Sequence, residues 1–326
     1  MFFLNVYMRN VASYIRSSCW KKNSIKVLVI ECFFNVISIT VLVAFLLISC
    51  TTKKPIAPSD YITLTDDLGR QVKVKKDAHR FLPLASSVTE MLYMICDTAE
   101  IVGRTPTCNY PPEVYSKPVV NNYPPDLERI LFLKPDLVIT KDGMLSLLQA
   151  AAIEKMGIPV YYQKYDNVND IFSGLERLAE ITNHKESGKK IADSLGVEMQ
   201  KYSGVERSLK PRKVLLLISK ESYFVFGKDT YASDILKLAG AVNAVDSIYD
   251  NPYPVLSAEY ILKVNPDIII GGEGVGLQKE FFELHPEMKR TNAYKNKQYF
   301  TVNDDYLSRP GPRVVEAVKV IQRIIK

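Results

Sequence analysis

The chain has 326 residues, of which 47% are hydrophobic, so it is long and apolar enough to form one or two folded cores and is not a disordered protein. Of its 42 basic and 36 acidic residues, five basic and one acidic lie in the first 49 positions, which leaves 37 and 35 in the rest. This near balance, without a basic run carrying interleaved aromatic residues, argues against a nucleic-acid-binding protein.

Residues 1–49 are predicted to be a targeting segment that is removed. Basic residues precede an apolar stretch, Cys32 to Ile48, which ends at Ser49-Cys50. This end resembles the lipobox of bacterial lipoproteins, which implies that Cys50 receives a lipid and begins the mature chain. The alternative is a plain transmembrane anchor, since about 17 to 22 apolar residues can span a bilayer. The long leader also leaves Met8 open as the true start.

Residues 50–60 are polar and contain prolines, which is typical of a tether. A β-hairpin is predicted next, with Tyr61–Leu64 and Gln71–Val74 as alternating strands and Asp66–Gly69 as the turn. Strands and helices then alternate. The predicted strands are Arg80–Leu84, Leu137–Thr140 and Val160–Tyr162, and the predicted helices are Val88–Ile95 and Met144–Met156. This alternation indicates an α/β fold with mainly parallel sheets flanked by helices.

An internal repeat indicates that the chain forms two similar lobes. The segment Asp126–Thr140, DLERILFLKPDLVIT, resembles Ser257–Gly271, SAEYILKVNPDIIIG. A second pair precedes it, because Ser87–Cys96 aligns with Tyr231–Gly240 and each of these follows an apolar strand. Two copies of one strand-helix-strand plan imply two α/β lobes.

A helical stretch lies between the two copies. Val168–Ile181 is one predicted helix, and a second runs from Lys185 to about Ser208. A helix of about 24 residues spans on the order of 35 Å, which is enough to cross from one lobe to the other. We therefore predict an N-terminal lobe at 61–166, linker helices at 167–211 and a C-terminal lobe at 212–326, with a ligand cleft between the lobes.

From Ile62 to its end, the chain resembles the substrate-binding proteins of ABC importers for vitamin B12, ferric siderophores and haem. Five segments carry the resemblance in a shared order: TDDLGRQVKV, SSVTEMLYMICDTAEIVGR, DLERILFLKPDLVIT, GKDTYASDILKLAGAVNAV and SRPGPRVVEAVKVI. The resemblance implies a binding protein without enzymatic activity or cofactor, whose two lobes are joined by one long helix. It also implies that the protein works in the cell envelope and delivers its ligand to an ABC permease dimer.

The loops are most similar to those of the cobalamin-binding members of this family, because Cys108–Glu113 combines an aromatic residue with a double proline as they do. The resemblance implies that seven side chains contact the ligand: Tyr110, Tyr123, Phe224, Tyr253, Asp305, Tyr306 and Arg309. Aromatic rings suit a wide, partly apolar ligand, and arginine can donate to oxygens at its edge. Tyr123 and Tyr253 stand where cobalamin binders have tryptophan, so a different corrinoid, a ferric siderophore or haem remains an alternative ligand.

Glu90 and Asp234 occupy equivalent positions in the repeat. In the family that the chain resembles, such paired surface acids meet arginines on the two permease subunits, and the resemblance implies this docking role for both. The alternative is that each lies on a solvated helix face, as most surface acids do.

Cys96 and Cys108 remain in the mature chain if Cys50 carries lipid. A disulfide between them and a pair of buried free thiols are both open.

Other chemistry is poorly supported by the sequence. The histidines are His79, His184 and His285, and no two of them have metal-ligand spacing, so a metal-ion binder is not expected. No nucleophile with a base and an orienting group stands out. An anchored envelope enzyme, and an adhesion or scaffold protein, are therefore the less favoured alternatives.

Overall fold

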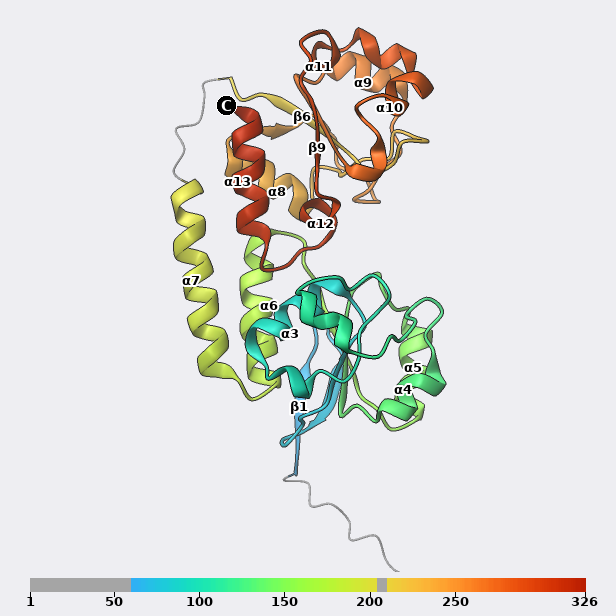
Figure 1. Ribbon diagram of the computed structural model, residues 1–326, viewed down its shortest axis with the longest axis vertical. Helices are drawn as coiled ribbons and strands as arrows, with labels where there is room; N and C mark the ends of the chain where they lie inside the picture. The colour runs from blue at the N-terminus through green and yellow to red at the C-terminus, as the bar shows by residue number, and fades with distance from the viewer. Residues whose placement is uncertain (1–59, 204–209) are drawn as a thin grey trace, which may run out of the picture. The chain divides into compact units, whose positions relative to one another are not determined.

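The computed structural model describes residues 60–203 and 210–326, and residues 59–326 form one compact unit (Figure 1). The predicted targeting segment, the lipidation site Cys50 and all but the last residue of the tether lie outside the described residues. Within the described ranges, none of the helices has the length and apolar character needed to cross a membrane.

The unit begins with the predicted hairpin, in which β1 (Tyr61–Thr65) pairs antiparallel with β2 (Gln71–Lys75). Asp66 organises the turn, because its carboxylate accepts hydrogen bonds from the backbone N–H groups of Leu68 and Arg70. Alternate residues of β2 are buried, as expected for a strand with one side against a core.

The first lobe contains a parallel sheet in the order β3 (Phe81–Pro83), β4 (Leu137–Lys141) and β5 (Val160–Gln163). The connecting elements are α3 (Ser86–Ile95), η2 (Thr98–Glu100), η3 (Pro112–Ser116), α4 (Leu127–Leu133) and α5 (Leu147–Lys155). Helix α5 begins three residues later than predicted, because Ser146 is its N-cap and accepts a hydrogen bond from the N–H of Gln149.

The second lobe contains a parallel sheet in the order β7 (Val242–Asn243), β6 (Lys213–Leu217), β8 (Ile268–Gly272) and β9 (Tyr299–Val302). Its helices are α8 (Tyr231–Ala239), α9 (Ala258–Val264), α10 (Glu280–Leu284), α11 (Asn292–Lys295), α12 (Asp304–Ser308) and α13 (Val314–Ile325), with 3-10 turns η4 (Glu273–Val275) and η5 (Pro286–Arg290). The alternation of strands and helices predicted from the sequence is confirmed in both lobes.

The repeat seen in the sequence is also a repeat of local structure. Helices α4 and α9 each have seven residues and an N-cap, Asp126 or Ser257, whose side chain accepts from the backbone N–H three residues later. Both helices end at a residue with left-handed backbone geometry, Lys134 at φ 46° and Asn265 at φ 47°. The helices of the two copies therefore begin with the same kind of cap and end with the same backbone turn before the following strand.

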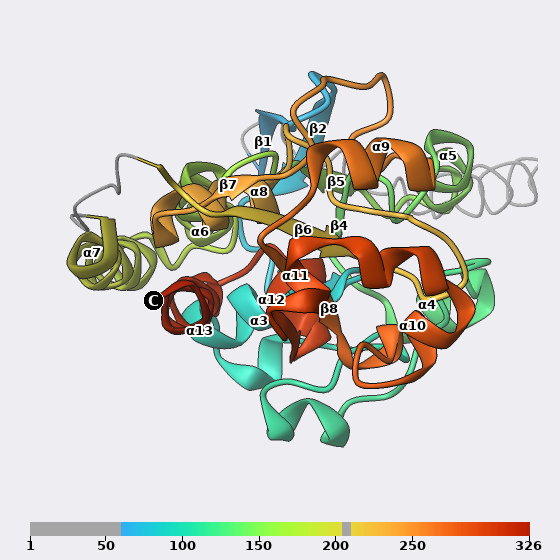
Figure 2. The ribbon, with the colours of Figure 1, turned by 90° about the horizontal axis from the view of Figure 1, so that it is seen from above.

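Two long helices join the lobes. Helix α6 (Val168–Ile181) and helix α7 (Lys185–Ser203) lie side by side in both ribbon views (Figures 1 and 2). Helix α7 contacts α3 of the first lobe and both α8 and α13 of the second. The prediction of a long helix that links the lobes is thus confirmed.

The hydrophobic core is continuous across the two lobes on the side of these helices. One face of each sheet, represented by Ile139 and Ile270, belongs to a single buried cluster that also contains Leu175 of α6 and Val318 of α13. The opposite faces belong to separate clusters, one in each lobe. Central strands such as β4 and β8 therefore alternate between a core shared by the lobes and a core of their own lobe.

Candidate functional site

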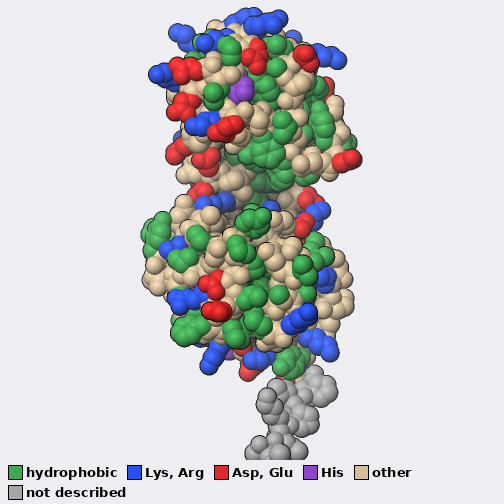
Figure 3. Space-filling model, turned by 90° about the vertical axis from the view of Figure 1, so that its right-hand side faces the viewer, with side chains coloured by type: hydrophobic (Ala, Val, Ile, Leu, Met, Phe, Trp, Pro, Cys, Tyr) green, Lys and Arg blue, Asp and Glu red, His purple; other side chains and the backbone are tan. Residues whose placement is uncertain are grey.

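The carboxyl ends of the two sheets point toward one another. Strand β5 leads into α6, and the backbone N–H of Val168 at the start of α6 donates to Asp234 of the second lobe at 3.1 Å. From the other side, the segment after β9 reaches the first lobe through Arg309. Figure 3 shows the molecule narrowing between the lobes, with acidic and basic side chains at the edges of the narrowing. Open α/β sheets present their ligands at such carboxyl ends.

Arg309 lies at the centre of the contacts between the lobes. Its Nη1 donates to the side-chain oxygen of Asn109 at 2.6 Å, and its Nη2 donates to the carbonyl of Thr107 at 2.8 Å. Its Nε lies 2.9 Å from a carboxylate oxygen of Asp305. The guanidinium predicted to bind the ligand is thus already bound to the loop that also carries Tyr110.

Arg313 makes the shortest ion pair of this region, with Glu90. Its Nε and Nη2 approach the two carboxylate oxygens of Glu90 at 2.8 and 2.5 Å, and Nη2 also lies 3.0 Å from Asp305. Burial lowers the pKa of Arg313, but the hydrogen bonds and charges of the two carboxylates outweigh that effect and raise the pKa above its usual range. Two arginines and two carboxylates therefore form a balanced network, Glu90, Asp305, Arg309 and Arg313, which we call the inter-lobe network.

The prediction that Glu90 is a surface acid is wrong. Its side chain is 2% exposed, because the helix face that carries it packs against the Arg309–Arg313 segment of the other lobe. Its equivalent, Asp234, is half-buried and accepts the N–H of Val168. Both repeat-equivalent acids thus contact the opposite lobe, and Glu90 is not available to meet a permease in this structure.

The predicted ligand-binding aromatic residues differ in their exposure. Tyr110 is 44% exposed, and its ring lies 4.6 Å from the Arg313 guanidinium, which places it beside the inter-lobe network. Tyr123 is 82% exposed in the segment between β3 and β4. An exposed ring of this size is free to contact a ligand.

The aromatic residues of the second lobe are half-buried and make their contacts within that lobe. Phe224 forms a backbone bridge with Val255, and Tyr253 lies edge-on against Phe226 with ring centroids 5.8 Å apart. Burial raises the pKa of Tyr253. The carbonyl of Tyr306 accepts a hydrogen bond from Tyr231 at 3.2 Å. Asp305 and Arg309 thus belong to the inter-lobe network and Tyr110 lies beside it, whereas the rings of the second lobe lie in the segments that follow β6, β7 and β9.

The sequence analysis missed several exposed apolar side chains near the carboxyl ends of the strands. Leu147 and Leu148, at the start of α5, are 58% and 82% exposed, and Ile248 and Val255, after β7, are 72% and 65% exposed. Figure 3 shows hydrophobic side chains on this side of both lobes. The Leu-Leu pair directly after the N-cap Ser146 could have indicated an apolar surface at the end of the sheet, because the first turn of a helix that follows a strand lies there.

The described residues form two pockets, one of which lies beside the contact between Val168 and Asp234. One of about 700 Å³ is lined by charged and polar side chains around the start of α8, among them Asp166, Lys228, Ser233 and Asp234. The other surrounds Arg212 near the C-terminus. Neither pocket is lined by a residue predicted to bind the ligand.

Cys96 and Cys108 are free thiols, and the disulfide alternative is wrong for this structure. The Cys108 Sγ lies 3.2 Å from the hydroxyl of Thr89, which is on α3. Cys96 lies seven residues further along, at the C-cap of the same helix, or about 10 Å away at 1.5 Å per residue. The two thiols therefore lie beside different parts of α3 and are not bonded to each other.

The chain is similar in sequence to known proteins. A profile described as periplasmic binding protein matches residues 83–306. The chain is 25% identical over 272 residues to the uncharacterized ABC transporter substrate-binding lipoprotein YvrC of Bacillus subtilis, covering 81% of this chain and 85% of that protein. It is 26% identical over 251 residues to a vitamin B12-binding protein of Vibrio cholerae, covering 76% of this chain and 90% of that protein.

A solved structure shows the same fold. It is the crystal structure of a possible iron-binding (periplasmic solute-binding) protein from Staphylococcus epidermidis, with 28% identity and a TM-score of 0.68. The match covers 77% of this chain and 99% of the solved chain.

Proposed function

The chain belongs to the periplasmic binding protein family, and from this premise we propose that it is the substrate-binding component of an ABC importer. It captures a corrinoid, with cobalamin as the first candidate, between its two lobes and delivers it to a permease dimer. The single observation that most supports the proposal is that segments following the carboxyl ends of β5 and β9 each contact the opposite lobe, through Val168 with Asp234 and through Arg309 with Asn109. No catalytic role is part of this proposal.

The side chains around the gap suit a corrinoid ligand. A corrin ring is wide and partly apolar, and aromatic and aliphatic side chains provide a large contact area for such a surface. Tyr110 and Tyr123 supply exposed rings from the first lobe, and Phe224, Tyr253 and Tyr306 supply half-buried rings from the second. The polar amides at the edge of the ring match the donors of Arg309 and the acceptor oxygens of Asp305.

Ligand binding by Arg309 requires an exchange of partners. Its guanidinium now donates to Asn109 and to the Thr107 carbonyl in the opposite lobe. A ligand oxygen that accepts one of these hydrogen bonds displaces the oxygen of Asn109 or Thr107. The direct contact between the lobes is then replaced by a contact through the ligand. We propose that Arg309 in this way couples binding to the relative position of the lobes.

A ferric siderophore or haem is the second candidate ligand. The observation that favours it is the 28% identity to the Staphylococcus epidermidis structure, whose description names a possible iron-binding protein. The replacement of the two expected tryptophans by Tyr123 and Tyr253 fits this alternative, because the corrin-binding pattern is incomplete at those positions.

We propose that the protein is held at a membrane of the cell envelope by lipid on Cys50, facing the periplasm or the exterior. The relative from Bacillus subtilis that carries the word lipoprotein in its name supports this anchor. A permease dimer remains the proposed partner. Of the two acids expected to dock on it, only Asp234 retains solvent exposure.

The test is isothermal titration of the full-length chain in detergent with cyanocobalamin, and in parallel with a ferric siderophore and with hemin. We expect one cobalamin per chain, and binding about tenfold weaker or worse in both Tyr253→Ala and Arg309→Ala. Arg290→Ala, an exposed arginine of η5, is the matched control and should bind as the wild type does. Binding of only the siderophore or hemin would keep the importer role and change the ligand; binding of none would contradict the proposal.

A further inference from the structure

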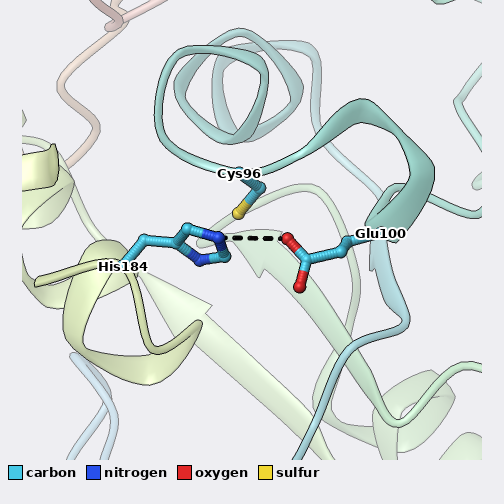
Figure 4. Close-up of side chains that lie close together, drawn as sticks. All are labelled: Cys96, Glu100 and His184. Carbon is cyan, nitrogen blue, oxygen red and sulfur yellow. Dashed lines mark ion pairs between the residues drawn. The ribbon is translucent and has the colours of Figure 1, made fainter.

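Three side chains with metal-binding atoms meet at the end of α3, in a part of the first lobe that does not contribute to the inter-lobe network. Cys96 is the C-cap of α3, Glu100 belongs to η2, and His184 lies in the turn between α6 and α7 (Figure 4). Their sulfur, carboxylate oxygen and ring nitrogen lie within 4.8 Å of one another. In Figure 4 the Cys96 sulfur and the Glu100 carboxylate both point toward the His184 ring.

The hydrogen bonds of His184 leave one ring nitrogen for a cation. Its Nδ1 lies 2.6 Å from the carbonyl of Thr182, so Nδ1 carries a proton and donates it to that carbonyl. In the neutral ring, Nε2 is then a lone pair, and it lies 3.2 Å from Oε2 of Glu100. At this distance the two atoms need either a proton on Nε2, as in an ion pair, or a metal ion that both of them bind. Metal-binding histidines commonly donate their other N–H to a backbone carbonyl in this way.

Glu100 is also held in place. Its Oε2 accepts the N–H of Asp97 at 3.1 Å, and its Oε1 lies 3.0 Å from Nδ1 of His79. Metal-bound carboxylates are often supported by such outer contacts. The Glu100 carboxylate is 15% exposed and the His184 side chain 27% exposed, so the cluster is partly shielded from water yet open enough for an ion to enter.

We propose that Cys96, Glu100 and His184 bind one divalent transition-metal ion of the zinc class. The ligands are the Cys96 sulfur, Nε2 of His184 and one oxygen of Glu100, with His79 supporting the carboxylate. Sulfur, nitrogen and oxygen ligands together suit four-coordinate Zn²⁺, and the fourth position is filled by water. Binding releases the thiol proton of Cys96 to solvent as the metal–sulfur bond forms.

The proposed ion has a mechanical consequence. It ties the turn between α6 and α7 to the end of α3, and both α6 and α7 contact the two lobes. The ion is therefore expected to stabilise the first lobe and the attachment of the connecting helices, and not to take part in the ligand binding proposed between the lobes.

The first test measures Zn²⁺ binding to the metal-free, full-length chain without an affinity tag, by competition with a chromophoric chelator. We expect one Zn²⁺ per chain and at least about a tenfold loss of affinity in Cys96→Ala and in His184→Ala. Cys108→Ser and His285→Gln are the matched controls, since these residues contact other groups, and they should retain wild-type affinity. Absence of Zn²⁺ binding, or equal binding by all four variants, would overturn the proposal.

Two further readouts keep the test independent of folding defects. Zn²⁺ should raise the thermal midpoint of the wild type but not that of the two ligand variants, because a ligand that binds only the folded state stabilises it. Co²⁺ in place of Zn²⁺ should give a thiolate-to-metal charge-transfer band that is absent from Cys96→Ala. A Co²⁺ complex without that band would show that Cys96 is not a ligand and would contradict the site.

Discussion

The two copies of the repeat place an acid at the same position of the same helix and give it different surroundings. Glu90 on α3 is almost fully buried and shared between Arg309 and Arg313 of the opposite lobe. Asp234 on α8 is half-buried and accepts one backbone N–H at the start of α6. Both acids contact the opposite lobe. Glu90 is paired there with two arginines, whereas Asp234 accepts a backbone N–H.

The difference arises from what each lobe presents to the other. The segment after α12 brings two arginines to Glu90, whereas the first lobe offers Asp234 the N-terminus of a helix, where the partial positive charge of the backbone is much smaller than a guanidinium charge. The repeat therefore sets the position of an acid but not its partner. The comparison predicts that equal substitutions in the two lobes have unequal effects.

The largest effect is expected at the two acids. Glu90→Ala leaves Arg313 with one carboxylate fewer in a buried network, and breaking such a pair costs on the order of 3 kcal/mol of unfolding free energy. Asp234→Ala removes one hydrogen bond at a half-buried position and should cost about 1 kcal/mol. Chemical denaturation of both variants measures the two values, and equal losses would show that the arginines add nothing to the contact between lobes.

A double variant separates charge from shape in the first comparison. Glu90→Met with Arg313→Met removes both partners, so no buried charge is left unpaired, and it should be more stable than Glu90→Ala. If the double variant is instead the least stable of the set, the main contribution to the unfolding free energy is the attraction between Glu90 and Arg313. The cost of leaving one buried charge unpaired is then the smaller contribution.

Alkaline pH tests the core of the first lobe. Burial raises the pKa of Tyr161 and of Tyr162 in β5 to about 12 each. Between pH 10 and 12 the unfolded chain loses these protons while the folded chain keeps them, so stability is full below pH 10 and falls as pH rises, by about 1.4 kcal/mol per unit and tyrosine. Tyr162→Phe keeps the ring and should flatten this fall in urea unfolding; an unchanged slope would contradict the assignment. Tyr299→Phe, on the edge strand β9 of the second lobe, is the control.

The smallest and most even effect is expected at the repeated helix starts. Asp126→Ala and Ser257→Ala each remove the cap of a seven-residue helix and should cost about 1 kcal/mol. Asp126→Asn and Ser257→Asp retain a capping oxygen and serve as controls. A loss confined to one lobe would break the equivalence of the two copies that their shared geometry indicates.

Much of the fold followed from the sequence. The hairpin, the alternation of strands and helices, and α6 over Val168–Ile181 were predicted, because strand alternation, turn residues and helix periodicity act over a few neighbouring residues. The start of α5 was misplaced at Met144, because an N-cap at Ser146 decides it and the apolar pattern does not. The predicted boundaries of the lobes, at 61–166, 167–211 and 212–326, remain predictions.

The candidate site was predicted from the family resemblance, which named Arg309 and Tyr253, and ligand contact by these residues remains a prediction. The partners of Arg309 were not readable, because Asn109 lies 200 residues away in the chain and is brought close only by the approach of the lobes. The exposed Leu148 was missed because periodicity predicts a buried face, not which residues a neighbouring lobe leaves uncovered.

The sequence by itself determined the two-lobed α/β plan, the repeated helix caps and the long connecting helices, since each depends on local backbone and side-chain chemistry. Only the tertiary structure decided that Glu90 is buried against Arg313 and that His184 meets Cys96 and Glu100. Charge pairing and metal-ligand geometry depend on atoms within a few ångströms, and in both cases those atoms come from segments that are far apart in the chain.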